Sequence, residues 1–104
     1  MYVTVHVYRA RAGEEDAIVA LHEDWQRHLR GDADGCLRDE LLRDARDPRR
    51  FMAIAHYESQ AAARAVSQNP EYTACQRRLE SLCQVDPEHG EYEAVIIPGE
   101  HHPR

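Results

Sequence analysis

The segment Phe51–Tyr57, with the sequence FMAIAHY, limits the possible folds most strongly because both of its faces are largely apolar. A strand with one face in water alternates apolar and polar residues, whereas a strand covered on both faces reads as an apolar run. The residues that follow, SQAAARA, are typical of a helix. A chain of 104 residues suits one domain, so we expect helices to cover one face of this strand and a different partner to cover the other.

The remaining segments supply the neighbours of this strand. Their patterns predict a strand at Tyr2–Arg9, a helix from Glu14 to Gly31, a strand and hairpin turn at Cys36–Asp47, a helix after Ser59 that Asn69-Pro70 interrupts and 71–83 resumes, and a strand at Glu91–Ile97. The order is β-α-β-β-α-β, which predicts an α+β, ferredoxin-like fold with a four-stranded antiparallel sheet and both helices on one face. We assign residues 1–97 to this domain and 98–104 to a C-terminal tail.

The second face of the predicted sheet is apolar and has no helix to cover it. Its residues are Val3, Val5, Val7, Met52, Ile54, Val95 and Ile97, with His56 on the same side. An exposed apolar patch of this kind favours association. We therefore expect a homodimer that packs sheet against sheet, and the alternative is a monomer whose strands alternate poorly.

Charge and cysteine content restrict the function. The net charge of −6 argues against non-specific binding of nucleic acid or of an anionic membrane. The sequence shows neither a membrane span nor a signal peptide, so we expect a cytoplasmic protein. Three cysteines, Cys36, Cys75 and Cys83, form no C-x-x-C pair. Nucleotide and flavin fingerprints, metal-ligand spacing and a G-x-S-x-G nucleophile are also absent from the sequence, so we expect no cofactor and no metal.

Several motifs resemble the antibiotic biosynthesis monooxygenase family in their order and spacing. They are the early strand, the glycine before the second strand, DPRRFMAIAHYES across the third strand and NPEY in the interrupted helix. The most specific motif is an aromatic-Glu-Ser end to the third strand, here Tyr57-Glu58-Ser59. The resemblance covers Met1–Ile97. It implies a dimeric α/β barrel, in which two sheets pack face to face and each subunit has a ligand cavity between sheet and helices.

Alternation and the resemblance together predict the lining of that cavity. If the valines of the first strand face the partner, then Tyr2, Thr4, His6 and Tyr8 face the helices, and the resemblance directs Phe51, Ala53, Ala55 and Tyr57 to the same side. The residues expected to bind substrate are Tyr8, His22, Trp25, Phe51, Ala53 and Tyr72. The residues expected to take part in catalysis are His6, Tyr57, Arg64 and Arg77. An imidazole can accept a proton near neutral pH, and an arginine lowers the pKa of a nearby acidic group such as a phenol.

An aromatic cavity with few polar groups suits a flat organic ligand. The resemblance implies a cofactor-independent monooxygenase, which removes a proton from a small aromatic, phenolic or quinol substrate and lets the anion reduce O₂. Two alternatives remain open. One is a dimeric barrel that binds a small molecule without catalysis, and the other is an isomerase or cyclase with His6 as proton shuttle, because the fold does not decide between these functions.

The chain departs from two branches of the family. Anthrone-oxidising relatives carry tryptophan, tyrosine and asparagine where this chain has Tyr57, Ala63 and Ala53, so the sequence does not give the substrate. The Asn, Trp and His triad of the haem-degrading branch corresponds here to His6, Val66 and Gln76. Because the axial haem ligand is missing, we expect no haem degradation.

Overall fold

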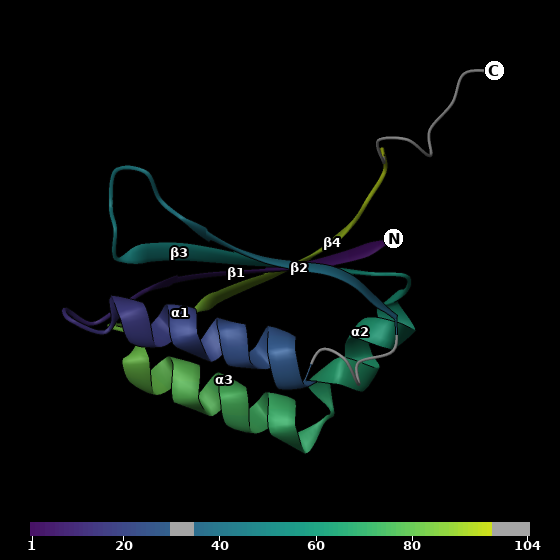
Figure 1. Cartoon of the computed structure of the whole chain (residues 1–104). Helices are drawn as coiled ribbons and strands as arrows, with labels where there is room; N and C mark the ends of the chain where they lie inside the picture. Colours follow the sequence, from purple (N-terminus) through teal and green to yellow (C-terminus); the bar gives the residue numbers. More distant parts are fainter. Residues whose placement is uncertain (30–34, 97–104) are drawn as a thin grey trace.

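The computed structural model describes residues 1–29 and 35–96 and confirms the α+β, ferredoxin-like fold. The elements in this part of the chain are β1 (Tyr2–Arg9), α1 (Glu15–Asp24), the π-helical segment η1 (Trp25–Leu29), β2 (Cys36–Arg43), β3 (Arg50–Tyr57), α2 (Gln60–Ser67), α3 (Pro70–Leu82) and β4 (Glu88–Glu93). The strands form one layer and the helices form a second layer on one side of it (Figure 1). The architecture thus has two layers, and one side of the sheet carries the helices.

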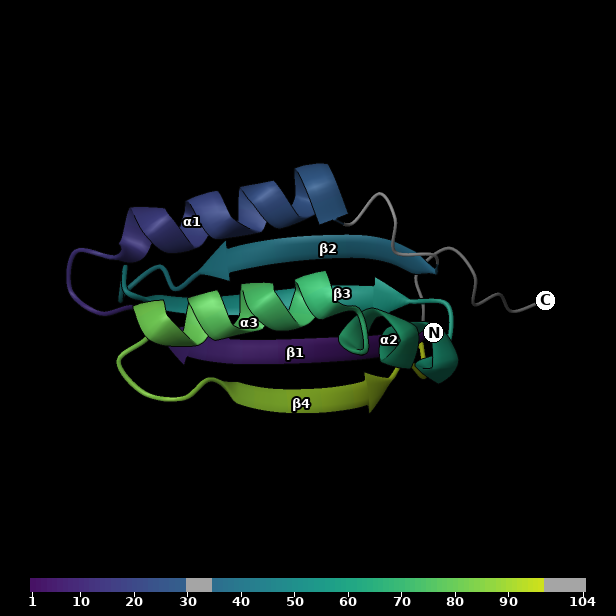
Figure 2. The ribbon, with the colours of Figure 1, turned by 90° about the horizontal axis from the view of Figure 1, so that it is seen from below.

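The sheet places β1 and β3 in the centre and β2 and β4 at the edges. Its order is β2-β3-β1-β4, and each neighbouring pair is antiparallel. The register sets His6 of β1 opposite Ala53 on β3 and opposite His89 on β4. In Figure 2, α3 lies across β1 and β3, and α1 lies alongside β2. The residues at the centre of β1 are therefore within reach of α3 and of the β4 edge.

The two faces of the sheet differ as the alternation predicts. Tyr8, Phe51, Ala53 and Tyr57 are buried on the face that the helices cover. The opposite face carries the predicted apolar residues of the two central strands, all of which are half-buried in the isolated chain: Val3, Val5, Val7, Met52, Ile54 and His56. Within residues 1–29 and 35–96, no helix covers this second face, which we call the open face (Figure 1).

The core between sheet and helices consists of two clusters. The first lies around Phe51, whose side chain is 1% exposed, and Ile18 of α1. The second lies around Trp25, Tyr57 and Val66. Burial of each such large side chain contributes about 1.5–3 kcal/mol relative to leaving it in water. Space remains between the two clusters, and the candidate site occupies that space.

The interruption of the second helix is confirmed at the predicted position. The Ser59 hydroxyl accepts a hydrogen bond from the Ala62 amide at 3.1 Å and caps α2. The Asn69 side chain accepts a bond from the Glu71 amide at 2.8 Å and caps α3, where Pro70 occupies the first turn. The new cap lets the chain change direction, so that α3 lies over the sheet while α2 lies beside the end of the strands (Figure 2).

The predicted position of the last strand is wrong. We expected it at Glu91–Ile97, but β4 spans Glu88–Glu93. Glu93 already pairs with Tyr2, the first residue of β1, so the antiparallel ladder has no partner strand beyond that point. Val95 is 84% exposed and does not contribute to the open face. Ile97 and the predicted tail at 98–104 lie outside the described residues.

Candidate functional site

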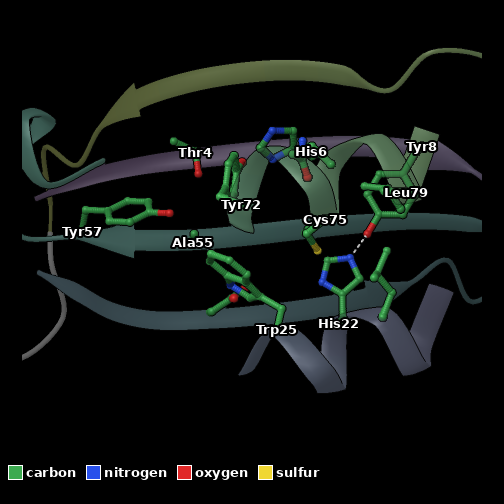
Figure 3. A pocket seen from close by; sticks show the side chains of 14 residues that line it. Thr4, His6, Tyr8, His22, Trp25, Ala55, Tyr57, Tyr72, Cys75 and Leu79 are labelled. Atoms are coloured by element: carbon green, nitrogen blue, oxygen red, sulfur yellow. Dashed lines mark hydrogen bonds between the residues drawn. The ribbon is translucent and has the colours of Figure 1, made fainter. Parts of the chain in front are cut away.

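A cavity of about 50 Å³ lies between the helix-covered face of the sheet and helices α1, η1 and α3. Figure 3 shows side chains from β1, β3, α3 and the first helical region pointing toward it. Its lining consists of Thr4, His6, Tyr8, Leu21, His22, Trp25, Asp39, Ala53, Ala55, Tyr57, Tyr72, Cys75, Gln76 and Leu79. This volume is large enough for only a few water molecules. A small aromatic ligand therefore fits only if some of the lining side chains move.

Aromatic side chains form much of the wall. Trp25, at the start of η1, packs edge-on against Tyr72 of α3, with ring centroids 5.2 Å apart. Tyr57 enters from the end of β3 and is buried. Burial raises the pKa of Tyr72 to about 12 and raises the pKa of Tyr57 as well, so both hydroxyls keep their protons. Ala53 and Ala55 have short side chains and leave the floor of the cavity open.

One end of the cavity contains a bonded tyrosine–histidine pair. The Tyr8 hydroxyl and Nε2 of His22 are hydrogen-bonded, and the two rings are stacked with an interplanar angle of 3° (Figure 3). Burial lowers the pKa of His22 to about 4 and raises the pKa of Tyr8. At neutral pH both groups are therefore uncharged. The pair joins β1 to α1 across the cavity.

The middle of the cavity contains a second histidine with different partners. Nε2 of His6 lies 2.8 Å from Nδ1 of His89 on the neighbouring strand β4. Nε2 of His89 lies 3.0 Å from the Glu91 carboxylate, which also accepts a hydrogen bond from the Tyr2 hydroxyl. Burial and the neighbouring His89 and His22 lower the pKa of His6 to about 4. His6 is therefore an uncharged imidazole at neutral pH.

Seven of the residues expected at the site line this cavity together: His6, Tyr8, His22, Trp25, Ala53, Tyr57 and Tyr72. Phe51 lies in the core and borders a separate surface recess with His22. Arg64 is exposed on α2 and borders a neighbouring recess with Tyr57 and Glu91. Arg77 is exposed on α3 and is not among the residues that line the cavity.

Several residues of the site were absent from the expected set. Asp39 and Gln76 line the cavity, and His89 and Glu91 bond to its wall through His6. The alternation of β4 carried a signal for the last two, because His89 and Glu91 are two apart and share a face of a strand. The strand was predicted too late in the chain for His89 to be included.

The residues that the structure describes offer few other chemical groups at the site. Cys75 is a thiol that lines the cavity, and burial raises its pKa, so it stays protonated. Across residues 1–29 and 35–96, no three His, Cys, Asp or Glu side chains are placed to hold a metal ion. The helices in these ranges are too short or too polar to cross a lipid bilayer.

Comparison with known proteins gives one family and one fold. The profile of the antibiotic biosynthesis monooxygenase family matches residues 1–78. One similar solved structure is an antibiotic biosynthesis monooxygenase, with 19% identity, coverage of 92% of this chain and 100% of the other, and a TM-score of 0.80. Another is Rv0793 of Mycobacterium tuberculosis, with 16% identity, coverage of 94% of this chain and 98% of the other, and a TM-score of 0.83. SnoaB of Streptomyces nogalater, a cofactor-independent oxygenase, is also similar, with 22% identity, coverage of 95% of this chain and 97% of the other, and a TM-score of 0.76. No curated protein matches by sequence.

Proposed function

The chain belongs to the antibiotic biosynthesis monooxygenase family, and we propose that it is a cofactor-independent monooxygenase for a small aromatic, phenolic or quinol substrate. The observation that carries the proposal is the uncharged imidazole of His6 on the wall of an aromatic cavity. A neutral imidazole has a lone pair that can accept a proton from a bound substrate. The similarity to SnoaB, an oxygenase that is cofactor-independent, supports the same reaction class.

The proposed reaction begins with proton removal. An acidic O–H or C–H proton of the substrate passes to His6, and the resulting anion transfers electrons to O₂. When a CH₂ group becomes a carbonyl, the substrate gives four electrons to O₂, one oxygen atom enters the product and the other leaves as water. All of the electrons come from the substrate, so the reaction balances without a redox cofactor.

The aromatic wall has the properties that substrate orientation requires. Trp25 and Tyr72 present ring edges and faces against which a flat substrate can stack. The protonated Tyr57 hydroxyl can donate a hydrogen bond to an oxyanion that forms in the cavity. Arg64 borders the adjacent recess and favours negative charge there from a greater distance. We assign no role to Arg77, since its side chain is exposed outside the cavity lining.

The active form is proposed to be a homodimer that buries the open face. The apolar residues of β1 and β3 on that face remain only half-buried in a single chain, which favours association through Val3, Val5, Val7, Met52, Ile54 and His56. Sedimentation velocity at micromolar concentration should give the mass of two chains. Val5→Glu, at the centre of the face, should give monomers, whereas a wild-type monomer at every concentration would contradict the dimer.

A second candidate is an isomerase on the same cavity. His6 and the Tyr8–His22 pair both line it, so one group could remove a proton from the substrate and the other could return one at a different atom. Such a reaction needs no O₂ and leaves the product mass equal to the substrate mass. Product mass therefore separates the two candidates.

The proposed function is tested by oxygen uptake. Purified, metal-free protein is incubated with a panel of anthrones, naphthols and quinols, and O₂ consumption and product mass are recorded. The proposal predicts uptake that depends on the protein and decreases in His6→Gln and Tyr57→Phe. Tight binding of a panel member without O₂ consumption would instead indicate a binding protein.

A further inference from the structure

A line of polar side chains leads from the cavity to the surface at the β1–β4 edge. His6 and His89 stand opposite each other in register on neighbouring antiparallel strands, and their rings lie 4.5 Å apart, centroid to centroid. The His89 side chain is 44% exposed, so the line reaches solvent within one residue of the cavity wall. Glu91 follows two residues later on the same side of β4.

The hydrogen-bond partners fix which nitrogens carry protons. An ionised carboxylate only accepts hydrogen bonds, so Nε2 of His89 carries a proton and donates it to Glu91. In neutral His89, Nδ1 is then unprotonated and accepts a bond from Nε2–H of His6. Neutral His6 has its lone pair on Nδ1, the ring nitrogen that His89 does not occupy. The resting arrangement therefore leaves one basic nitrogen on a residue of the cavity wall.

We propose that His6, His89 and Glu91 form a proton relay that carries the substrate proton from the cavity to solvent. The proposal rests on the proposed function. The substrate proton binds Nδ1 of His6, and the proton on Nε2 of His6 moves to Nδ1 of His89. His89 becomes a cation beside Glu91 and then releases the proton on its Nε2 to water. When the reduced oxygen atom leaves as water, it takes up the proton on Nδ1 of His6. Nε2 of His6 then takes the proton from Nδ1 of His89, and Nε2 of His89 takes one from solvent. These steps restore the first arrangement, and the complete reaction releases no net proton.

A relay answers a difficulty that His6 alone would have. With its pKa at about 4, a protonated His6 is disfavoured about 10³-fold at pH 7, so it holds a substrate proton poorly. His89 can take that proton and pass it to water, because its side chain is partly exposed and lies beside the Glu91 carboxylate. Hydrogen bonds from Tyr2 and His89 hold the pKa of Glu91 below its usual range, so the carboxylate is ionised at neutral pH.

The charges around the relay come from three further elements. Arg64 of α2 borders the same recess as His89 and Glu91. Glu80 of α3 and Asp86 of the following loop border a second recess with His6 and His89. Two carboxylates on that side and one arginine on the other give the surroundings of the relay a net negative charge.

Two variants distinguish a role in proton transfer from a purely structural role, in which the His6–His89 hydrogen bond only holds β4 against β1. In His89→Gln, the amide oxygen can still accept the bond from His6 but an amide cannot carry the proton onward. In Glu91→Gln, the shape is retained and the negative charge is lost. Glu93→Gln is the matched control, because it removes an equal charge from the same strand and Glu93 has no hydrogen bond to the relay in the described structure.

The first measurement needs no turnover. Nitrogen-15 NMR of the imidazoles in ligand-free protein at pH 7 should find neutral His6 with its proton on Nε2. His89→Gln should leave that tautomer unchanged. A His6 proton on Nδ1 would overturn the relay, because the basic nitrogen would then point to His89. This result stands whether or not the protein is an oxygenase.

The second measurement uses turnover. His89→Gln should lower kcat at least about 10-fold at low buffer concentration, with KM unchanged, and added imidazole buffer should restore part of the rate. Glu91→Gln should show a smaller loss, and Glu93→Gln should match wild type. An unchanged kcat in His89→Gln, or a loss that no buffer restores, would overturn the relay. If wild type consumes no O₂ but the tautomer is as predicted, the monooxygenase proposal alone fails.

Discussion

The two histidines of the cavity share an environment but differ in their partners. His6 and His22 both line the cavity, and burial lowers the pKa of each to about 4. His22 bonds to Tyr8, a buried hydroxyl that keeps its proton, so this hydrogen bond does not lead to an exposed group. His6 bonds to His89, which is exposed and paired with Glu91. Burial thus sets the charge of both rings, and the next partner decides whether a proton can leave.

The largest expected difference between the two histidines is the effect of replacing each one by glutamine on kcat. His6→Gln should lower kcat by about 10²–10³-fold, because it removes the proposed proton acceptor. His22→Gln should lower kcat by less than about 10-fold, since it changes only the position of Tyr8 and the ligand. The measurement is steady-state O₂ uptake with the best substrate of the panel. An equal loss in both variants would contradict a special role for His6.

Stability is the property in which the two histidines should behave alike. An unfolded histidine protonates below about pH 6.5, whereas these two resist protonation until about pH 4 in the folded state. Because the unfolded chain binds more protons between these values, stability is lost as the pH falls from 6.5 to 4. Each histidine should contribute about 1–2 kcal/mol to that loss, after allowance for partial solvent exposure. Urea unfolding at pH 7 and pH 4.5 measures it, and either glutamine variant should reduce the loss.

A difference in the pH dependence of the two variants would refine this comparison. If only His22→Gln reduced the loss of stability, then the pKa of His6 in the folded state would not be lowered as far as that of His22. Asp44 and Glu91, whose pKa values lie below the usual range, lose stabilising interactions over an overlapping acidic range in all variants. The loss of stability between pH 7 and pH 4.5 in each glutamine variant is therefore compared with the loss in wild type, so that the contributions of Asp44 and Glu91 cancel.

The two tyrosines near the ends of the cavity should also differ. Tyr57→Phe should lower kcat/KM about 5–10-fold, because its hydroxyl is proposed to donate a hydrogen bond to the oxyanion that forms in the cavity. Tyr8→Phe should change kcat/KM by less than about 2-fold, since the Tyr8 hydroxyl is already bonded to His22 and only its ring can contact the ligand. Steady-state O₂ uptake by the two variants gives the comparison. A larger effect at Tyr8 would reverse the proposed orientation of the substrate.

The smallest expected effect concerns the two arginines. Arg64→Gln should reduce kcat/KM about 2–5-fold, because the charge borders a recess next to Tyr57 and is screened by solvent. Arg77→Gln should have no measurable effect, since the side chain is exposed outside the cavity lining. Kinetics at low and high salt check this, and the Arg64 effect should decrease as salt rises. A large loss in Arg77→Gln would require a different cavity shape in the bound state.

Local sequence patterns predicted those parts of the site that depend on a single strand or helix. Alternation in β1 and the family resemblance in β3 indicated which side of each strand faces the helices. Ser59 and the break at Asn69-Pro70 marked the start and the interruption of the second helix correctly. The apolar run at the end of the chain suggested a strand through Ile97. The actual limit of β4 is set by where β1 begins, which is a long-range property of pairing that a local pattern does not contain.

The same limitation hid the link between His6 and His89. These residues are 83 positions apart, and only the register of two antiparallel strands brings their nitrogens to 2.8 Å. A shift of one residue would turn His89 to the other face of the sheet. Arg77 is the opposite case, because it was expected to take part in catalysis but its side chain lies on the exposed side of α3.

The central claim is that O₂ oxidises a substrate in this cavity after His6 removes a proton. The most direct measurement is the mass of the product that metal-free protein forms under ¹⁸O-labelled dioxygen, for wild type and His6→Gln. The account predicts one heavy oxygen atom in each product molecule and a strongly reduced yield in the variant. A product with the mass of the substrate, or a labelled product formed equally well by His6→Gln, would contradict it.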